Sequence, residues 1–181
     1  MSSTIWTIGH STRTLETFIA LLKAHAIGAI ADVRAFPSSR RHPQFNLDAL
    51  ENALQQVGIQ YHHVSALGGR RKSRRDSMNQ GWRNSSFRGY ADYMQTAQFK
   101  EGLARLLSFA AGQPTAIMCA EAMPWRCHRS LIADALLSGG WSVRHILTPA
   151  KADLHALTSF AQMEGGVLFY PSPSPQGPSL F

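Results

Sequence analysis

Short apolar segments of strand length alternate with amphipathic segments of helix length along most of the chain. The apolar segments cover residues 5–8, 29–34, 59–64, 116–119 and 143–147. When a helix connects consecutive strands of one sheet, the crossover makes those strands parallel. The pattern therefore predicts a single doubly wound α/β domain with a mostly parallel, five-stranded sheet and helices on both faces.

The expected domain spans residues 1–168 and accounts for nearly the whole chain of 181 residues. A chain of this length is long enough to bury one substantial core, and nothing in it requires a second domain. The remaining tail, residues 169–181, is rich in proline and serine and has no apolar periodicity. We therefore expect this tail to be loose.

Two regions between the strands depart from a simple strand–helix alternation. Residues 70–88 form a long polar loop rich in arginine, and residues 90–111 follow as helix with an expected break near Thr96. Loops of this length inside a domain are usually functional or disordered. After the fifth strand, leucines at helical spacing predict a last helix at residues 150–163.

Arginine dominates the charged residues. The chain has 14 arginines and 4 lysines against 11 acidic residues, and its formal net charge is +7 at pH 7. Such a charge attracts polyanions, and the planar guanidinium group suits bidentate contacts with phosphate or carboxylate. We therefore expect an anionic partner, and the simpler alternative is weak non-specific affinity for nucleic acid.

The sequence indicates neither a membrane protein nor an oxidising compartment. No apolar run approaches the roughly 20 residues of a membrane span, and the first residues lack the basic and apolar regions of a signal peptide. Two cysteines are too few for a disulfide scaffold. We expect a cytoplasmic protein that binds no membrane and keeps both cysteines as thiols.

Polar residues and glycines follow four of the predicted strands at their carboxyl ends. In a parallel sheet these ends share one edge, where ligands bind and helix N-termini offer free N–H groups. We therefore expect one cleft at this edge. Its expected lining consists of Gly9, His10, Ser11, Asp32, Arg34, Ser38, Gly68, Gly69, Arg70, Cys119, Glu121, Arg126, Cys127, His128 and Arg129.

The centre of the predicted site is the stretch from Pro114 to Arg129, which contains both cysteines of the chain. We assign the chemistry to the thiols, carboxylates and imidazoles and the substrate anion to the glycines, serines and arginines. The candidate catalytic residues are Cys119, Glu121, Cys127, His128, Asp32 and His10. The candidate anion-binding residues are Gly9, Ser11, Arg34, Ser38, Gly68, Gly69, Arg70, Arg126 and Arg129.

A thiol nucleophile is the first chemistry that this stretch allows. Cys127 lies at a helix start among cationic residues, and the helix dipole and positive charge both favour a thiolate. Cys119 at a strand end is the alternative nucleophile. Six residues separate Cys119 from Arg126, which is one too many for the oxyanion loop of the cysteine phosphatases. The simplest alternative is that both cysteines are small buried apolar residues.

A metal site is the second chemistry. Cys119, Cys127 and His128 would supply three ligands, and His10 or Glu121 a fourth, a set suited to zinc or iron. The spacing differs from that of paired C-x-x-C motifs. The sequence therefore leaves the cofactor unknown.

Acid–base chemistry on a phosphate-bearing ligand is the third possibility. Asp32 or Glu121 would be the carboxylate and His10 or His128 its acid–base partner. The anion clamp would consist of Arg34, Arg126 and Arg129. Asp32 and Arg34 lie two residues apart on one strand face, so the alternative is a purely structural ion pair.

Several segments together resemble the domain-of-unknown-function 488 family of bacterial and archaeal proteins. The resemblance covers roughly residues 4–148 and implies a compact α/β domain of cytosolic origin with no settled reaction. The matching segments, in chain order, are TIGHS (7–11), DVR with the following PSS (32–39), LGG (67–69), FxxYAxYM (87–94) and CAE followed by CHR (119–129).

From these observations we expect an enzyme that binds a phosphate-bearing substrate, a nucleotide or a nucleic acid, in the cleft at the strand ends. The alternative is a nucleic-acid-binding module without catalysis, in which the arginines matter and the cysteines do not. A further alternative is a zinc- or iron-dependent site at Cys119, Cys127 and His128. The sequence does not determine the oligomeric state.

Overall fold

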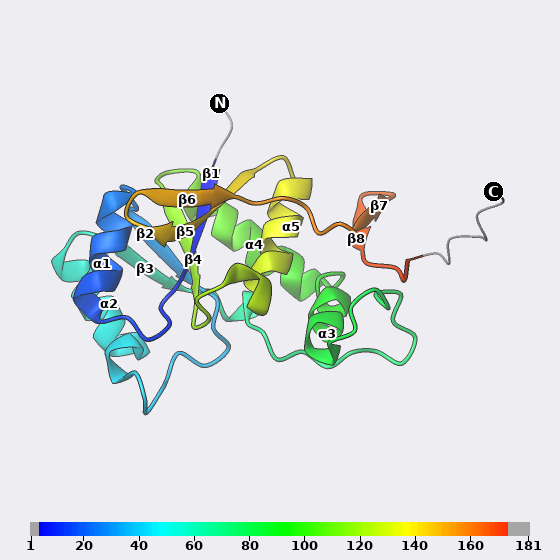
Figure 1. Cartoon of the computed structure of the whole chain (residues 1–181), viewed down its shortest axis with the longest axis horizontal. Coiled ribbons are helices and arrows are strands. Elements are labelled where there is room, and N and C mark those ends of the chain that lie inside the picture. Colours follow the sequence, from blue (N-terminus) through cyan, green and yellow to red (C-terminus); the bar gives the residue numbers. More distant parts are fainter. Residues whose placement is uncertain (1–3, 174–181) are drawn as a thin grey trace, which may run out of the picture.

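A six-stranded, mostly parallel sheet forms the centre of the computed structural model, which describes residues 4–173 (Figure 1). Its strands are β1 (Thr4–Gly9), β2 (Ala29–Asp32), β3 (Gln60–His63), β4 (Thr115–Cys119), β5 (Ser142–Thr148) and β6 (Lys151–Leu154). The helices are α1 (Leu15–Ala24), α2 (Leu47–Gln56), α3 (Ser85–Tyr93), α4 (Ala97–Ala110) and α5 (Arg129–Ser138). The remaining elements are the hairpin β7 (Gln162–Glu164) and β8 (Val167–Phe169) and the short 3₁₀ turns η1 (Pro43–Phe45), η2 (Ser65–Leu67) and η3 (Pro124–Arg126).

The strands lie in the order β3-β2-β4-β1-β5-β6. The first five in this order are parallel to their neighbours, and β6 pairs antiparallel with β5 at the edge. The predicted α/β class with a mostly parallel sheet is confirmed. The predicted number of five strands is wrong, because β6 adds a sixth.

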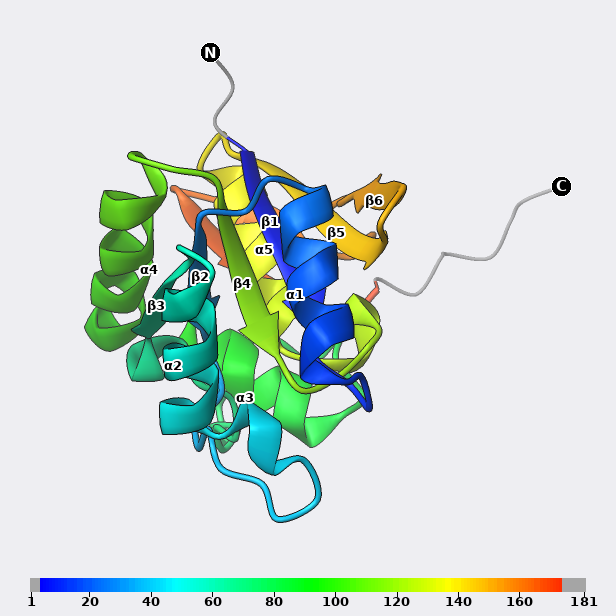
Figure 2. The same ribbon diagram turned by 90° about the vertical axis from the view of Figure 1, so that its left-hand side faces the viewer.

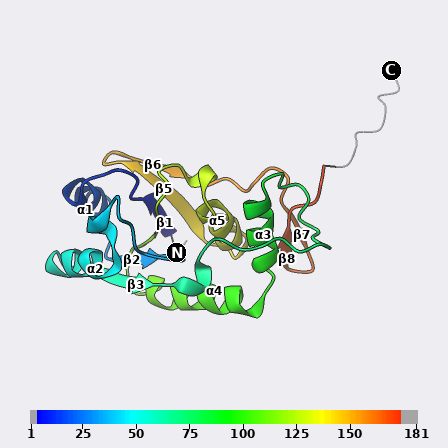
Figure 3. The same cartoon turned by 90° about the horizontal axis from the view of Figure 1, so that it is seen from below.

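Alternate residues of the central strands face two separate hydrophobic clusters. In β4, Ile117 and Cys119 belong to a cluster with residues of α4 and α5, whereas Ala116 and Met118 belong to a cluster with residues of α1 and α2. Figures 2 and 3 show α1 and α2 on one side of the sheet and α4 and α5 on the other. Because successive side chains of a strand point to opposite faces, a strand covered on both faces must be apolar throughout.

The segment predicted as a last helix, residues 150–163, is instead the strand β6, a loop and the first residues of β7. Leu154 is 61% exposed, although the helical pattern placed it on a buried face. The backbone N–H of His155 donates to Val143 O, and the side chain of His155 bonds to Asp134 on α5. These long-range hydrogen bonds favour an extended segment, and they outweigh a weak local preference for helix.

The helical region predicted at residues 90–111 consists of two helices, and the predicted break near Thr96 is confirmed. The predicted loop at residues 70–88 ends earlier than expected, because α3 begins at Ser85. Thr96 precedes α4 as its N-cap, and its hydroxyl oxygen accepts the backbone N–H of Phe99 at 3.3 Å. A capping hydroxyl satisfies one of the free N–H groups at a helix start. Thr96 therefore marks the beginning of α4.

The arginine-rich loop before α3 has no regular secondary structure, but Asp92 of α3 fixes part of it. The buried Asp92 carboxylate accepts hydrogen bonds from the backbone N–H of Arg74 at 2.8 Å, the hydroxyl of Ser77 at 2.6 Å and the side-chain amide of Asn79 at 2.7 Å. A buried carboxylate needs such donors. The loop is therefore attached to α3 along residues 74–79.

The chain packs onto the domain beyond residue 168. Tyr170 is buried, donates its hydroxyl to Asp134 at 2.8 Å and donates its backbone N–H to the Asn79 side chain at 2.9 Å. The tail predicted to be loose covers residues 169–181, and its part from residue 174 onward lies outside the described residues. Among residues 4–173, no helix has the length and apolar character needed to cross a membrane.

Candidate functional site

A cleft of about 580 Å³ opens beyond the carboxyl ends of β1, β2 and β4. Residues from five separate segments of the chain line it. The predicted site residues in its wall are His10, Arg34, Ser38, Gly69, Arg70, Cys119, Glu121, Arg126, Cys127 and His128. The structure thus brings most of the predicted site together at one edge of the sheet.

The other predicted site residues do not line this cleft. They are Gly9, Ser11, Asp32, Gly68 and Arg129. An adjoining cavity of about 410 Å³ includes Ser11 and shares His10, Glu121 and Arg126 with the cleft. The two hollows therefore share one wall, and a ligand larger than the cleft has room to extend past Ser11.

The position of the cleft follows from the topology of the sheet. β1 and β4 are adjacent, but α1 after β1 contributes to one hydrophobic cluster and α5 after β4 contributes to the other. Helices that leave adjacent parallel strands toward opposite faces create a crevice at the carboxyl ends of these strands. Ligands of α/β proteins commonly bind in this crevice.

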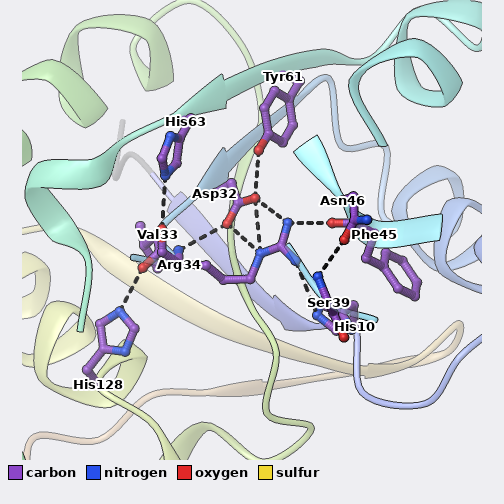
Figure 4. A network of polar contacts seen from close by, with 10 residues as sticks. All are labelled: His10, Asp32, Val33, Arg34, Ser39, Phe45, Asn46, Tyr61, His63 and His128. Carbon is purple, nitrogen blue, oxygen red and sulfur yellow. Dashed lines mark hydrogen bonds and ion pairs between the residues drawn. The ribbon is translucent and has the colours of Figure 1, made fainter. Parts of the chain in front are cut away.

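Asp32 and Arg34 form a buried ion pair at the end of β2 (Figure 4). Nη2 of Arg34 lies 2.6 Å from Oδ2 of Asp32, and the hydroxyl of Tyr61 donates to the same oxygen at 2.7 Å. Nη2 of Arg34 also donates to Phe45 O at 2.7 Å. These partners compensate the burial of both charges. Asp32, predicted as a catalytic carboxylate, therefore lies behind Arg34 and fixes its side chain.

His10 is a neutral imidazole beside this ion pair. Its Nδ1 donates to Ser11 O at 2.9 Å, its Nε2 faces Nη1 of Arg34 at 3.5 Å, and its ring stacks on Phe45 with 4.3 Å between centroids. Burial lowers the pKa of His10 to about 4, and the nearby Arg34 charge acts in the same direction. At neutral pH, Nε2 of His10 therefore accepts a hydrogen bond from Arg34. This bond orients the Arg34 guanidinium along the cleft wall.

His128 presents one defined nitrogen to the cleft. Its Nε2 must donate to Val33 O, 3.0 Å away, because a carbonyl oxygen only accepts (Figure 4). The other nitrogen, Nδ1, lies 4.0 Å from Sγ of Cys127. Gly69 makes room for the ring, since a Cβ atom at this position would lie 3.0 Å from Nδ1. His128 Nδ1 is thus placed to take up or release a proton beside Cys127.

Cys119 and Cys127 are free thiols whose Sγ atoms lie 2.7 Å apart in the cleft wall. Burial disfavours the charged form of Cys127, but the hydrogen bond with Cys119, the contact with His128 and the charge of Arg129 hold its pKa well below the usual range. Burial and the hydrogen bond to Cys127 raise the pKa of Cys119. These surroundings favour the charged form at Cys127 and disfavour it at Cys119.

The guanidinium of Arg129 is buried without a carboxylate partner among residues 4–173. Arg129 is 1% exposed, and its Nη2 donates to the backbone oxygens of Glu121 and Ala122 at 2.8 and 3.2 Å. Its Nε has no hydrogen-bond partner among the described residues. The backbone N–H of Arg129 donates to Sγ of Cys127 at 3.3 Å. A buried cation is costly without a nearby negative charge, and the Arg129 charge favours the ionised form of the Cys127 thiol.

The predicted metal ligands are not arranged as a metal site. Within the part of the chain that the structure describes, no group of three or more His, Cys, Asp or Glu side chains is placed to hold an ion. The two sulfur atoms are 2.7 Å apart, whereas a tetrahedral zinc ion about 2.3 Å from each sulfur would hold them farther apart. His128 uses Nε2 for Val33 O, which leaves only Nδ1.

Several residues of the site were not identified from the sequence. Phe36, His42 and Phe87 line the cleft, and Tyr61 and His63 of β3 support the segment after β2. Phe36 is 70% exposed, and an aromatic residue in a polar loop after a strand is a signal that the sequence does contain. The roles of Tyr61 and His63 depend on the pairing of β3 with β2, which no local pattern reveals.

Comparison with known proteins identifies one family. The family model described as "Domain of unknown function DUF488" matches residues 14–136. No curated protein and no solved structure shows a significant match to the chain. The matched span contains every cleft residue named above except His10.

Proposed function

This chain belongs to the DUF488 family, whose description names no activity, and from the geometry of its cleft we propose that it is an enzyme. In this proposal the Cys127 thiolate is the nucleophile, and the substrate is phosphate-bearing, either a nucleotide or a nucleic acid. The sulfur forms a transient covalent bond with an electrophilic atom of the substrate. We place the enzyme in the cytoplasm, because a reducing compartment keeps both thiols available.

The observation that carries this proposal is the buried guanidinium of Arg129, which has no carboxylate partner among residues 4–173 and whose charge acts on both thiols. A purely structural cysteine pair in an apolar core does not need a buried cation. A thiolate does, because an isolated buried anion is costly. The N–H group at the start of α5, which donates to the same sulfur at 3.3 Å, adds to this stabilisation.

The charge of the cleft supports an anionic substrate. Arg34, Arg70 and Arg126 line it, whereas Glu121 is the only acidic side chain in its wall. The Asp32 pairing and the His10 contact hold Arg34 in one orientation. A guanidinium fixed in this way is suited to bind a phosphate group without further loss of side-chain entropy.

An exposed aromatic ring supports a substrate that carries a base. Phe36 lies in the cleft wall with 70% of its surface exposed, and the guanidinium carbon of Arg70 lies 5.7 Å from the centre of its ring. Bases stack on exposed aromatic rings and on guanidinium planes, and such stacking tolerates different bases. The neighbouring arginines would then bind the phosphate.

Two residues are placed to move protons in this reaction. His128 Nδ1 lies 4.0 Å from the nucleophilic sulfur, and Glu121 is the acidic residue among those that line the same cleft. We assign His128 as the base that controls the protonation of Cys127 and Glu121 as the acid that protonates the leaving group. His10 and Asp32 are positioning residues that act through Arg34.

The proposal is tested by protection of Cys127 from alkylation. Iodoacetamide labelling of Cys127 should slow several-fold when ATP or a single-stranded oligonucleotide fills the cleft, and Arg126→Ala should weaken this protection. Arg144→Ala, on the exposed surface of β5, is the matched control and should leave the protection unchanged. Failure of both compounds to slow labelling would refute a phosphate-binding cleft at Cys127.

The alternative is a nucleic-acid-binding module in which the arginine-rich loop binds the backbone. Much of this loop is engaged within the protein. The guanidinium of Arg71 lies 3.7 Å from the ring centre of Tyr93, and Arg74 pairs with Asp76 at 2.7 Å. Arg88, in the first turn of α3, donates to Trp82 O of the loop at 2.9 Å. These contacts leave fewer free groups for a nucleic acid, and they favour the enzyme.

The enzyme and the binding module predict different effects of substitutions on turnover and on oligonucleotide binding. Cys127→Ser should abolish turnover and spare oligonucleotide affinity if the protein is an enzyme. Replacing Arg70, Arg71, Arg74 and Arg75 together should flatten the salt dependence of oligonucleotide binding if it is a module, because each phosphate contact contributes to that slope. Binding measured at several salt concentrations separates the two outcomes.

A further inference from the structure

The two sulfur atoms of the cleft are close enough to react with each other. Cys119 ends β4, Cys127 lies just before α5, and their Sγ atoms are 2.7 Å apart. A disulfide bond is roughly 2.05 Å long, so bond formation requires a displacement of less than about 1 Å. The chain has no other cysteine, so each thiol has only this partner within the protein.

The pair is chemically asymmetric in the way that a reactive and a resolving cysteine are. Cys127 accepts hydrogen bonds from the Arg129 backbone N–H and lies beside His128, whereas the neighbours of Cys119 are Cys127 and the backbone oxygen of Glu121. Oxidants attack the thiolate of such a pair, and a nearby thiol then converts the product into a disulfide. Both cysteines line the cleft, which a molecule as small as hydrogen peroxide can enter.

We propose that Cys127 and Cys119 form a reversible disulfide when the protein meets a hydroperoxide, with Cys127 as the reacting cysteine and Cys119 as the resolving cysteine. The Cys127 thiolate attacks one peroxide oxygen, which breaks the O–O bond and gives a sulfenic acid and hydroxide. The Cys119 sulfur then attacks the Cys127 sulfur, and hydroxide leaves with the Cys119 proton as water. The hydroxide from the first step takes up the proton that Cys127 released on ionising, so that in total two thiols and one hydrogen peroxide yield one disulfide and two waters.

Oxidation has two consequences for the cleft. It removes the nucleophile, and it removes the negative charge beside the buried Arg129. Because a buried cation without a counter-charge is unfavourable, the reduced pair is stabilised relative to the disulfide. A dithiol reductant therefore restores both thiols by exchange and is itself oxidised to a disulfide.

Peptide mapping tests this proposal without any substrate or activity assay. Trypsin cleaves after Arg126 and after Arg129, so Cys127 lies on the short peptide of residues 127–129 and Cys119 on the peptide of residues 106–126. After treatment of the folded protein with hydrogen peroxide, these two peptides should be found joined, and dithiothreitol should separate them. A non-reducing gel should show the chain as a monomer.

Single substitutions distinguish the two roles. In Cys119→Ser the peptide of residues 127–129 should gain two oxygen atoms as a sulfinic acid that dithiothreitol does not reverse. In Cys127→Ser the remaining thiol of Cys119 should oxidise at least ten-fold more slowly than Cys127 does. Wild-type protein in which Cys127 becomes a sulfinic acid without joined peptides would overturn the proposal, and equal oxidation rates of the two single-cysteine variants would overturn the assigned roles.

Discussion

Gly9 determines how closely the segment after β4 approaches the end of β1. A Cβ atom at this position would overlap the backbone oxygen of Glu121. At the next two residues, the backbone N–H of His10 donates to Cys119 O at 3.0 Å, and the backbone N–H of Ser11 donates to Ala120 O at 2.9 Å. The close approach therefore brings His10 and the cysteine pair to the same cleft.

Gly9→Ala should push these segments apart and lower the free energy of unfolding by about 1–3 kcal/mol, because an added methyl group in a packed site forces backbone shifts. Urea denaturation measures the change. Gly112→Ala is the control, since the nearest atom to a Cβ there is Phe109 O at 3.7 Å. Equal stability of the two variants would contradict the proposed role of Gly9.

The sequence was sufficient to predict many of the residues that meet at the cleft, but it missed others and could not assign all of their roles. Polar residues at the ends of apolar strands must share an edge when the strands are parallel. Asp32 was predicted as a catalytic carboxylate, yet Arg34 and Tyr61 occupy its oxygens. Tyr61 reaches Asp32 because β3 pairs with β2, and this pairing is a long-range property that no local pattern contains.

At the scale of elements, strands that are apolar throughout were predicted more reliably than the segment after β5. β4 contains five buried residues in succession, which is the pattern of a strand covered on both faces. The segment from residue 151 to 155 has only one buried residue, His155. Its conformation is determined by pairing with β5 and by the bond of His155 to Asp134, and the leucine spacing was misleading.

Asp134→Ala should therefore loosen the segment from His155 to Tyr170, which Asp134 attaches to α5. The buried Asp134 carboxylate accepts hydrogen bonds from His155 Nε2, from the backbone N–H of Thr158 and from the hydroxyl of Tyr170. Each donor left without a partner costs about 1–3 kcal/mol, so we expect a loss of roughly 3 kcal/mol or more in the free energy of unfolding, measured with urea.

The matched control for this variant is Asp153→Ala. Asp153 lies on β6, and its side chain is 48% exposed in a surface ion pair with Lys151. Surface ion pairs contribute little to stability, so the free energy of unfolding of this variant should change by less than about 0.5 kcal/mol. A similar effect of both substitutions would show that Asp134 does not organise the segment.

At the scale of the whole molecule, two buried imidazoles connect stability to pH. Burial lowers the pKa of His10 and of His145 to about 4, and the charges of His155 and Arg129 add to the effect at His145. The unfolded chain has an ordinary pKa near 6.5 at both positions. Between these values the unfolded state binds more protons than the folded state, so acid favours unfolding.

The two histidines should accordingly make the free energy of unfolding fall as the pH is lowered from 6.5 toward 4. By linkage, each histidine contributes up to roughly 3 kcal/mol to this loss. Denaturation in urea at a series of pH values measures it, and His145→Gln should make the decline shallower. Stability that is constant or rises between pH 6.5 and pH 4 would contradict the burial of both neutral rings.

The topology of the whole molecule explains why a local reading of the sequence located the cleft. The strand order β3-β2-β4-β1-β5-β6 places β4, which carries Cys119, beside both β1 and β2. The strand order itself was not predictable, because the strands are similarly apolar and a sequence does not state which of them are neighbours. Predicting that the polar residues share one edge of the sheet required only that the strands are parallel.

The central claim is that Cys127 is a thiolate at neutral pH, and the pH dependence of its alkylation tests this most directly. Cys119→Ser leaves Cys127 as the only cysteine and keeps a hydroxyl group beside it, and Cys127→Ser gives the corresponding protein for Cys119. We predict that iodoacetamide reacts with Cys127 at a rate that has reached its plateau below about pH 7 and with Cys119 only at higher pH. A Cys127 rate that rises through about pH 8.5, as for an ordinary thiol, would contradict the account.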